Sequence, residues 1–93
     1  MTTFVVEYRY DARAAVRDEI RPRHRAFLGA LLADGSLLAS GPITDGPAGA
    51  LLLVVAQSVP AVEQLLDGDP FWQAGLVSAR TVRGWDPVLR SWD

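Results

Sequence analysis

The amino-acid sequence predicts a small α+β domain whose elements follow the order βαββαβ. Three observations carry this prediction: a period-two alternation over the first ten residues, an apolar stripe with helical spacing after Pro22, and an uninterrupted apolar run at 50–56. A period of two is typical of a half-buried strand, whereas a period near 3.6 is typical of an amphipathic helix. Because the chain has 93 residues, of which 49% are hydrophobic, we expect a single domain, 1–93, with its own core.

The first strand is predicted near the N-terminus, where every second residue is a large apolar or aromatic one: Phe4, Val6, Tyr8 and Tyr10. That side of the strand is expected to face the core. The residues that follow, 11–20, are mostly polar and are compatible with either a loop or a short helical turn.

The first helix is predicted to begin at Pro22, because the N–H that proline lacks would have no intrahelical partner in a first turn. Its buried stripe follows the spacing i, i+3, i+4, i+7 and i+8, which corresponds to His24, Phe27, Leu28, Leu31 and Leu32. Gly35 is expected to end the helix in the left-handed conformation.

The second half of the chain is predicted to supply the remaining elements. In order, these are a strand at 37–40 stopped by Gly41-Pro42, a turn at 44–49, a strand at 50–56 buried on both faces, a helix capped by Ser58, a short helical turn from Asp69-Pro70 to Ala74, and a strand at 77–85.

Two split βαβ units of this kind form a four-stranded antiparallel sheet with both main helices on one face, the ferredoxin-like plait. The strand at 50–56 is apolar on both of its faces, so the face without helices also needs a cover. The chain has no spare element for this purpose. The sequence therefore predicts a homodimer in which a second sheet covers the first.

Composition excludes several classes of function. The net charge is −2 and all nine basic residues are arginines without a basic run, which argues against nucleic acid as a partner. The absence of cysteine excludes disulfides, thiol catalysis and thiolate zinc sites, and fits a cytoplasmic protein. Met1 leads directly into a strand pattern and no apolar stretch is long enough for a membrane span, so neither a signal peptide nor a membrane partner is expected.

His24 is the only histidine, and it lies in the middle of the predicted apolar stripe. A metal site is disfavoured because zinc and similar ions usually need three protein ligands, and no second histidine or any cysteine is available; we expect no metal and no cofactor. Two roles stay open: a buried structural histidine bonded to a carbonyl, or a group that transfers protons near neutral pH.

Asp69, in the segment GDPFWQAG, is the candidate carboxylate partner of such a histidine. Its position before Pro70 also predicts a helix N-cap, and the two roles are compatible because a capping carboxylate has a second oxygen free. Phe71 and Trp72 would supply apolar walls. Tyr8 and Tyr10 are expected in the core or in a pocket wall with their hydroxyls at the rim. The segment Ser40, Gly41, Pro42 either lets a substrate approach the backbone or only starts a turn.

The segments RPRHRAFLGALLADGSLLASGP and DPFWQAGLV, in this order and spacing, resemble the YCII-related (YciI-like) domain family over nearly the whole chain. The most specific parts are the helix-borne histidine followed by GSLLASGP, and the tripeptide DPF. The resemblance implies a ferredoxin-like fold assembled as a dimeric α+β barrel. It also implies an active site built on a His–Asp dyad, here His24 and Asp69.

In architecture the family is similar to muconolactone isomerase, and a chloromuconolactone dehalogenase belongs to it. The resemblance therefore implies a lyase- or isomerase-type enzyme that transfers a proton or eliminates a group from lactones or related organic acids. The expected substrate-binding residues are Tyr8, Ser40, Gly41, Pro42 and Phe71. A non-catalytic small-molecule-binding or accessory domain is the alternative, and a purely structural dimer is a third reading.

Overall fold

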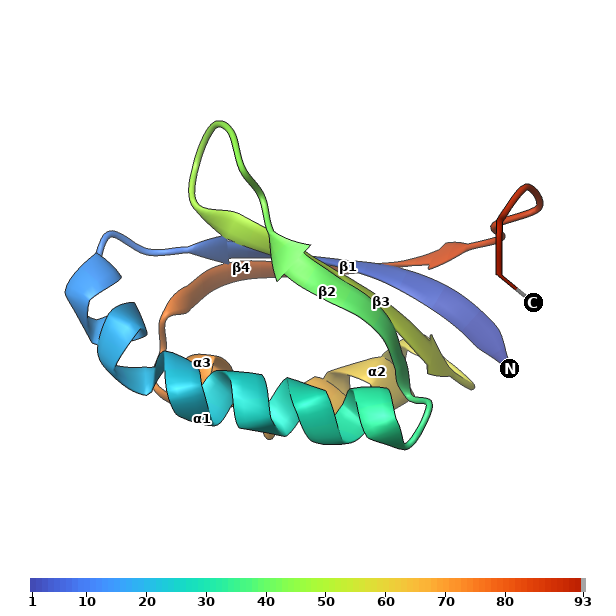
Figure 1. The fold of residues 1–93 in the computed structure, drawn as a ribbon, viewed down its shortest axis with the longest axis horizontal. Helices are drawn as coiled ribbons and strands as arrows, with labels where there is room; N and C mark the ends of the chain where they lie inside the picture. Colours follow the sequence, from blue (N-terminus) through green and yellow to red (C-terminus); the bar gives the residue numbers. More distant parts are fainter. Residues whose placement is uncertain (93) are drawn as a thin grey trace.

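The computed structural model describes residues 1–92. Its elements are β1 (Thr2–Tyr10), α1 (Ala14–Ala33), β2 (Leu37–Pro42), β3 (Gly49–Ala56), α2 (Val59–Leu66), α3 (Pro70–Gln73) and β4 (Val77–Trp85). The strands form one four-stranded sheet of order β2-β3-β1-β4, antiparallel throughout. All three helices lie against one face of the sheet (Figure 1). The predicted ferredoxin-like α+β fold is thereby confirmed.

The core lies between this helical layer and the sheet. Successive side chains of a strand point to opposite faces, and the inward residues of the two central strands, β1 and β3, are buried. Val6, Leu52 and Val54 are fully enclosed, and Val62 and Leu66 of α2 close over them. Gly49 begins β3 because a Cβ atom there would overlap the carbonyl oxygen of Tyr8 on the neighbouring strand.

The predicted start of the first helix at Pro22 is wrong, because α1 begins eight residues earlier, at Ala14. Pro22 lies inside the helix, where it removes one backbone hydrogen bond without ending it. Residues 11–20 are mostly polar, so a hydrophobicity pattern does not show which side of this part of the helix faces the core. The first residues on the inward side are arginines. Arg17 is buried and Arg21 is half-buried, on the same side of α1 as His24. Arginine can line a buried face because its methylene stem packs there while the guanidinium finds polar partners.

The helix ends agree with the sequence more closely than this start. Gly35 closes α1 at φ 87°, and the N–H of Ser36 donates to the carbonyl of Leu31, as in the usual left-handed helix ending. The hydroxyl of Ser58 caps α2 by accepting from the N–H of Ala61. Leu32 was predicted in the buried stripe, but it is 55% exposed. Leu31 is buried and is the last residue of the stripe to face the core.

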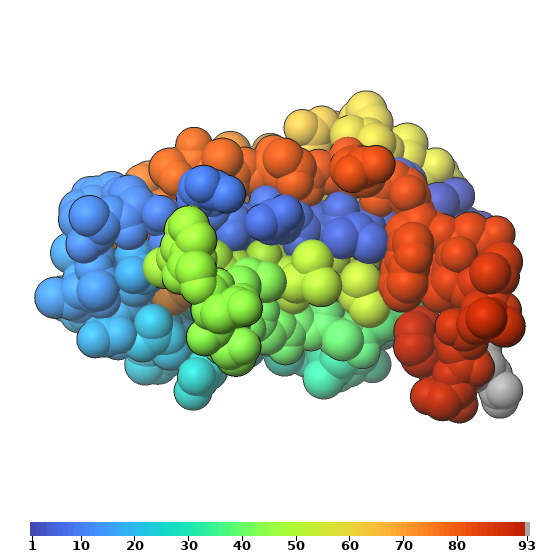
Figure 2. Space-filling model, turned by 90° about the horizontal axis from the view of Figure 1, so that it is seen from above, coloured from blue at the N-terminus to red at the C-terminus, as the bar shows by residue number. Residues whose placement is uncertain are grey.

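The outer face of the sheet carries no helix. In β3, Leu51 on this face is 40% exposed, whereas its neighbour Leu52 is fully buried. Within one chain the strand is therefore buried on one face only, although it lies inside the sheet as predicted. Figure 2 looks onto this outer face and shows the strands uncovered over much of their length, with the C-terminal segment folded over one end. The homodimer stays a prediction that this apolar face supports.

Candidate active site

Asp69 is the centre of the candidate site and is completely buried. Its extended backbone makes it the N-cap of α3, and its Oδ1 accepts from the N–H of Phe71 at 2.9 Å. The same oxygen lies 2.7 Å from Nδ1 of His24, while Oδ2 accepts from the hydroxyl of Tyr8 at 3.0 Å. A buried carboxylate is costly unless hydrogen bonds replace its hydration, and here donors from α3, α1 and β1 do so. The predicted cap and the contact with His24 thus share one oxygen.

His24 reaches this carboxylate from α1, with 8% of the residue exposed. Because a carboxylate only accepts, Nδ1 must carry the hydrogen that it donates to Asp69. In the neutral imidazole this arrangement assigns Nε2 the free electron pair. Phe71 stacks on the imidazole with ring centroids 3.8 Å apart and planes inclined by 6°. The two contacts fix the position and the orientation of the imidazole ring.

Tyr8 is part of this hydrogen-bond network, because its hydroxyl donates to Asp69. Burial raises the pKa of Tyr8 well above its usual range, and the negative charge of Asp69 and the hydrogen bond to it act in the same direction. Tyr8 is therefore a neutral donor at any ordinary pH. It holds the carboxylate in place from the side opposite to His24 and the N–H of Phe71.

Two further residues extend the site: Tyr10, which was expected in the core or in a pocket wall, and Arg17, which the sequence did not single out. Tyr10 contacts the edge of Phe71 with centroids 5.5 Å apart, and the Arg17 guanidinium lies 4.9 Å above the Tyr10 ring. Burial and the charge of Asp69 raise the pKa of Tyr10 to about 12, against the opposing charges of Arg17 and Arg21. The spacing i, i+4, i+7 of Arg17, Arg21 and His24 could have indicated that these residues share one side of a helix. It was missed because residues 11–20 are mostly polar and were compatible with a loop.

Trp72, expected as an apolar wall beside Phe71, has a different neighbour. The guanidinium of Arg80, on β4, lies 3.7 Å from the centroid of the Trp72 ring and pairs with Asp67 at 3.0 Å. Nη1 of Arg80 is buried without a hydrogen-bond partner among the residues that the structure describes. Phe71 is thus the residue of this pair that contacts the imidazole.

The segment Ser40 to Pro42 lies on the edge strand β2, away from the His24–Asp69 contact. Pro42 pairs with Ala50, and Ala50 pairs with Tyr8, so Pro42 stands in the same row as Tyr8 but two strands away, about 10 Å. Ser40 pairs with the buried Leu52 and shares this helix-facing side, whereas Gly41 pairs with Leu51 on the other side. In residues 1–92, no hydrogen bond joins these three residues to the pair.

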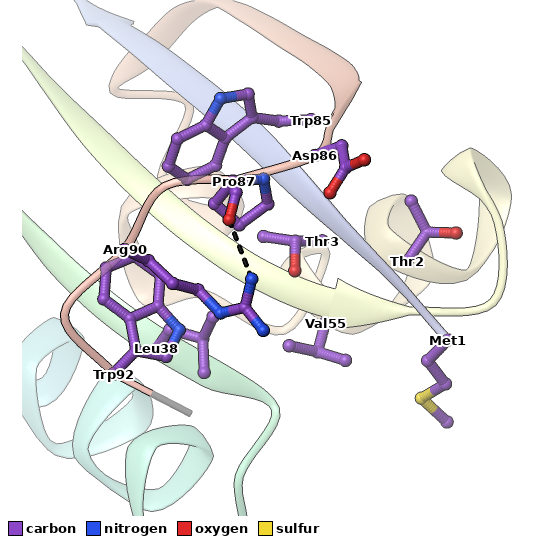
Figure 3. A pocket seen from close by; sticks show the side chains of 10 residues that line it. All are labelled: Met1, Thr2, Thr3, Leu38, Val55, Trp85, Asp86, Pro87, Arg90 and Trp92. Atoms are coloured by element: carbon purple, nitrogen blue, oxygen red, sulfur yellow. Dashed lines mark hydrogen bonds between the residues drawn. The ribbon is translucent and has the colours of Figure 1, made fainter.

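A cavity of about 520 Å³ lies elsewhere, where the C-terminal segment folds over the outer face of the sheet (Figure 3). Trp85, Arg90 and Trp92 are among its walls, and the Arg90 guanidinium donates to the carbonyl of Pro87. A second hollow, of about 380 Å³, separates α1 from β2 and is lined by Arg25, Leu37 and Ser40, among others. His24 and Asp69 line neither.

No three side chains of histidine, cysteine, aspartate or glutamate within residues 1–92 gather as a metal site would require. None of the helices in the same range has the length and apolar character needed to cross a lipid bilayer.

Comparison with known proteins supports the fold and identifies the family. A solved structure with a TM-score of 0.79 is 5-chloro-2-hydroxyhydroquinone dehydrochlorinase (TftG) from Burkholderia phenoliruptrix AC1100, in complex with 2,5-dihydroxybenzoquinone. It is 25% identical in sequence, and the match covers 90% of this chain and 93% of that chain. No curated protein matches the chain. Residues 1–86 match the YCII-related domain, and the chain therefore belongs to the YCII-related domain family.

Proposed function

We propose that the protein is a small-molecule enzyme in which His24 and Asp69 form a dyad for proton transfer or elimination. The single observation that carries this proposal is the 2.7 Å contact between Nδ1 of His24 and Oδ1 of the buried Asp69. A general base needs one nitrogen free and the ring held in one tautomer, and the contact meets both needs. Such a group typically contributes about 10²–10⁴-fold to a rate.

In an elimination, Nε2 of His24 accepts a proton from the substrate. The electron pair of the broken bond to hydrogen forms a new π bond, and the leaving group departs with its bonding pair as an anion. Asp69 stabilises the imidazolium that results, and Tyr8 keeps the carboxylate in position. In an isomerisation the same proton returns to a different substrate atom. Neither reaction needs a redox step.

The substrate class is proposed from two sources. The similar dehydrochlorinase acts on a chlorinated hydroxyhydroquinone, from which it removes hydrogen chloride, and its complex holds a dihydroxybenzoquinone. The sequence resemblance points to lactones and related organic acids. Hydroxyhydroquinones and lactone carboxylic acids are both compact organic molecules with an acidic O–H group. Of the residues expected to contact the substrate, we keep Ser40 and Pro42, which face the same side of the sheet as the dyad, and Phe71, which lies against the imidazole. Gly41 faces the other side.

We also propose that the working form is a homodimer whose sheets face each other. Leu51, Leu53 and Val55 form an apolar row on the outer face of β3, and Leu38 and Trp85 extend it. Burying this row removes apolar surface from water, at roughly 25 cal/mol per Å². Sedimentation should give about twice the 10.1 kDa of one chain. Leu53→Glu should yield monomers, whereas Leu32→Glu, on the helical layer, should not.

The decisive experiment is turnover of two substrate sets, chlorinated hydroxyhydroquinones followed by chloride release, and lactones followed by absorbance. His24→Asn is the matched variant, because its amide nitrogen can replace Nδ1 as donor to Asp69 but cannot act as a base. We expect the turnover of this variant to be lower than that of the wild type by about 10²-fold or more, while its fold is unchanged. Equal turnover by His24→Asn would refute the dyad. Binding without any turnover in the wild type would make the chain a binding domain.

A further inference from the structure

One side of α1 carries two guanidinium groups in line with the imidazole. Arg17, Arg21 and His24 follow the spacing i, i+4 and i+7, which places them on the same side of a helix. The burial pattern agrees, since Arg17 and His24 are buried and Arg21 is half-buried, whereas Arg23 and Arg25 are exposed. The dyad is thus flanked along its helix by positive charge.

Tyr10 connects these charges to the dyad. Its ring lies under Arg17 and contacts the edge of Phe71, which stacks on His24. Arg17 and Arg21 lower the pKa of its phenol, against burial and the charge of Asp69, which raise it. Unlike the Tyr8 hydroxyl, that of Tyr10 makes no hydrogen bond within residues 1–92. It remains available as a donor.

The two arginines differ in how firmly they are held. Arg17 is anchored, because Nη1 donates to the carbonyl of Asp11 and its side chain is 10% exposed. Arg21 pairs with Asp18 one turn away on the same helix, and the Asp18 side chain is largely exposed. Such a surface pair contributes little to stability, so the Arg21 guanidinium can exchange it for a ligand oxygen.

We propose that Arg21 and the hydroxyl of Tyr10 bind an ionised oxygen of the substrate, an enolate, phenolate or carboxylate, beside His24. Arg17 is the positioning residue that holds the Tyr10 ring. This inference rests on the proposed function and names the substrate class as anionic. The hydrogen bond from Arg21 is stronger when the ligand oxygen is ionised, because both partners are then charged. An ionised oxygen on the ring of the substrate also supplies electron density that helps to expel a leaving group.

The experiment measures binding, not turnover, with two matched pairs of probes. One pair is 2,5-dihydroxybenzoquinone, the ligand of the similar structure, and its dimethyl ether, which cannot ionise. The other pair is a lactone carboxylic acid and its methyl ester. The variants are Arg21→Gln and Tyr10→Phe. Arg23→Gln is the control, since it makes the same charge change two residues away at an exposed position.

We expect the wild type to prefer the anionic member of at least one pair. Arg21→Gln should weaken its binding about tenfold, the effect of losing one charge-assisted hydrogen bond. Tyr10→Phe should remove part of the preference without changing the Tm, and Arg23→Gln should bind as the wild type does. Equal affinity for both members of both pairs, no binding of any probe, or an unaffected Arg21→Gln would overturn the inference.

The two proposals fail in different ways. If the anion preference depends on Arg21 but His24→Asn leaves turnover intact, the anion site stands and the dyad falls. If His24→Asn abolishes turnover but Arg21→Gln binds the anion normally, the dyad stands and the anion site falls. Raising the salt concentration gives an independent readout, because screening should weaken the binding of the anionic probe and not that of its neutral partner.

Discussion

Phe71 lies flat against the imidazole of His24, with ring centroids 3.8 Å apart and planes within 6° of parallel. The backbone N–H of the same Phe71 donates to Oδ1 of Asp69, the oxygen that contacts His24. One residue therefore supports both members of the candidate dyad, one through its ring and the other through its backbone.

Replacement of the Phe71 ring should change the NMR signals of the His24 ring protons. His24 is the only histidine in the chain, so its ring protons give one isolated pair of signals. The ring current of Phe71 should shift them upfield relative to the unfolded chain, and Phe71→Leu should reverse that shift. We expect the variant to lose about 1–2 kcal/mol of stability, because Phe71 is buried and leucine is smaller. An unchanged spectrum would contradict the stacking.

Asp69→Asn should separate folding from chemistry. Two donors, the N–H of Phe71 and Nδ1 of His24, meet at Oδ1, so the amide oxygen should occupy that position and keep the cap. The amide nitrogen would then donate to the oxygen of Tyr8. We expect a small change in Tm and a loss of turnover of about 10²-fold or more, because a neutral amide stabilises the imidazolium less.

The same variant has a spectroscopic control. Nitrogen-15 NMR of the single histidine distinguishes its tautomers, and both the wild type and Asp69→Asn should show the Nδ1-protonated form. Full turnover in Asp69→Asn would reduce Asp69 to a helix cap.

Tyr8→Phe should lower the stability of the folded protein and leave its substrate specificity unchanged. The substitution removes the only hydrogen bond that the described residues donate to Oδ2 of Asp69 and leaves a buried carboxylate oxygen unpaired. Such a loss costs about 1–3 kcal/mol. Chemical denaturation should report the decrease. Tyr10→Phe is the matched control, because its hydroxyl makes no hydrogen bond within residues 1–92, and its stability should change by less than about 0.5 kcal/mol.

Alkaline titration should find both tyrosines protected. The chain has only two, Tyr8 and Tyr10, and burial raises both pKa values above the usual 10.0. Near pH 10 the unfolded chain loses these protons while the folded protein retains them. Stability should therefore be complete below pH 10 and decline as the pH rises through about 12, the pKa of Tyr10. Tyrosinate absorbance that appears at pH 10 before unfolding would contradict this.

Gly49→Ala should destabilise the fold at the start of β3. A methyl group there would overlap the carbonyl oxygen of Tyr8, and backbone atoms on a central strand cannot move aside cheaply. We expect a loss of about 1–3 kcal/mol by thermal or chemical denaturation. Gly29→Ala is the control, since no atom lies within 4 Å of the added Cβ and alanine favours a helix interior. It should be neutral or stabilising.

The sequence predicted the strands and the caps at Ser58 and Asp69, because these depend on short patterns with a strong local preference. The pairing of His24 with Asp69 was expected from the resemblance to the YCII-related domain family, since no short pattern joins residues that are 45 apart. The prediction failed at the start of α1, where Arg17 and Arg21 occupy inward positions that a hydrophobicity pattern reads as solvent-facing. Which Asp69 oxygen takes which donor, and the stacking of Phe71, depend on how distant segments meet. No periodicity encodes such contacts.

The contacts of Asp69 span most of the chain, since Tyr8 and His24 are 61 and 45 residues away from it in sequence. Bringing such distant segments together costs loop-closure entropy, which only the completed sheet and helical layer repay. A nascent or partly folded chain therefore carries an ordinary, freely rotating histidine. The contact of His24 with Asp69 forms only in the finished fold, so the surroundings of this one imidazole report whether the whole molecule has been assembled.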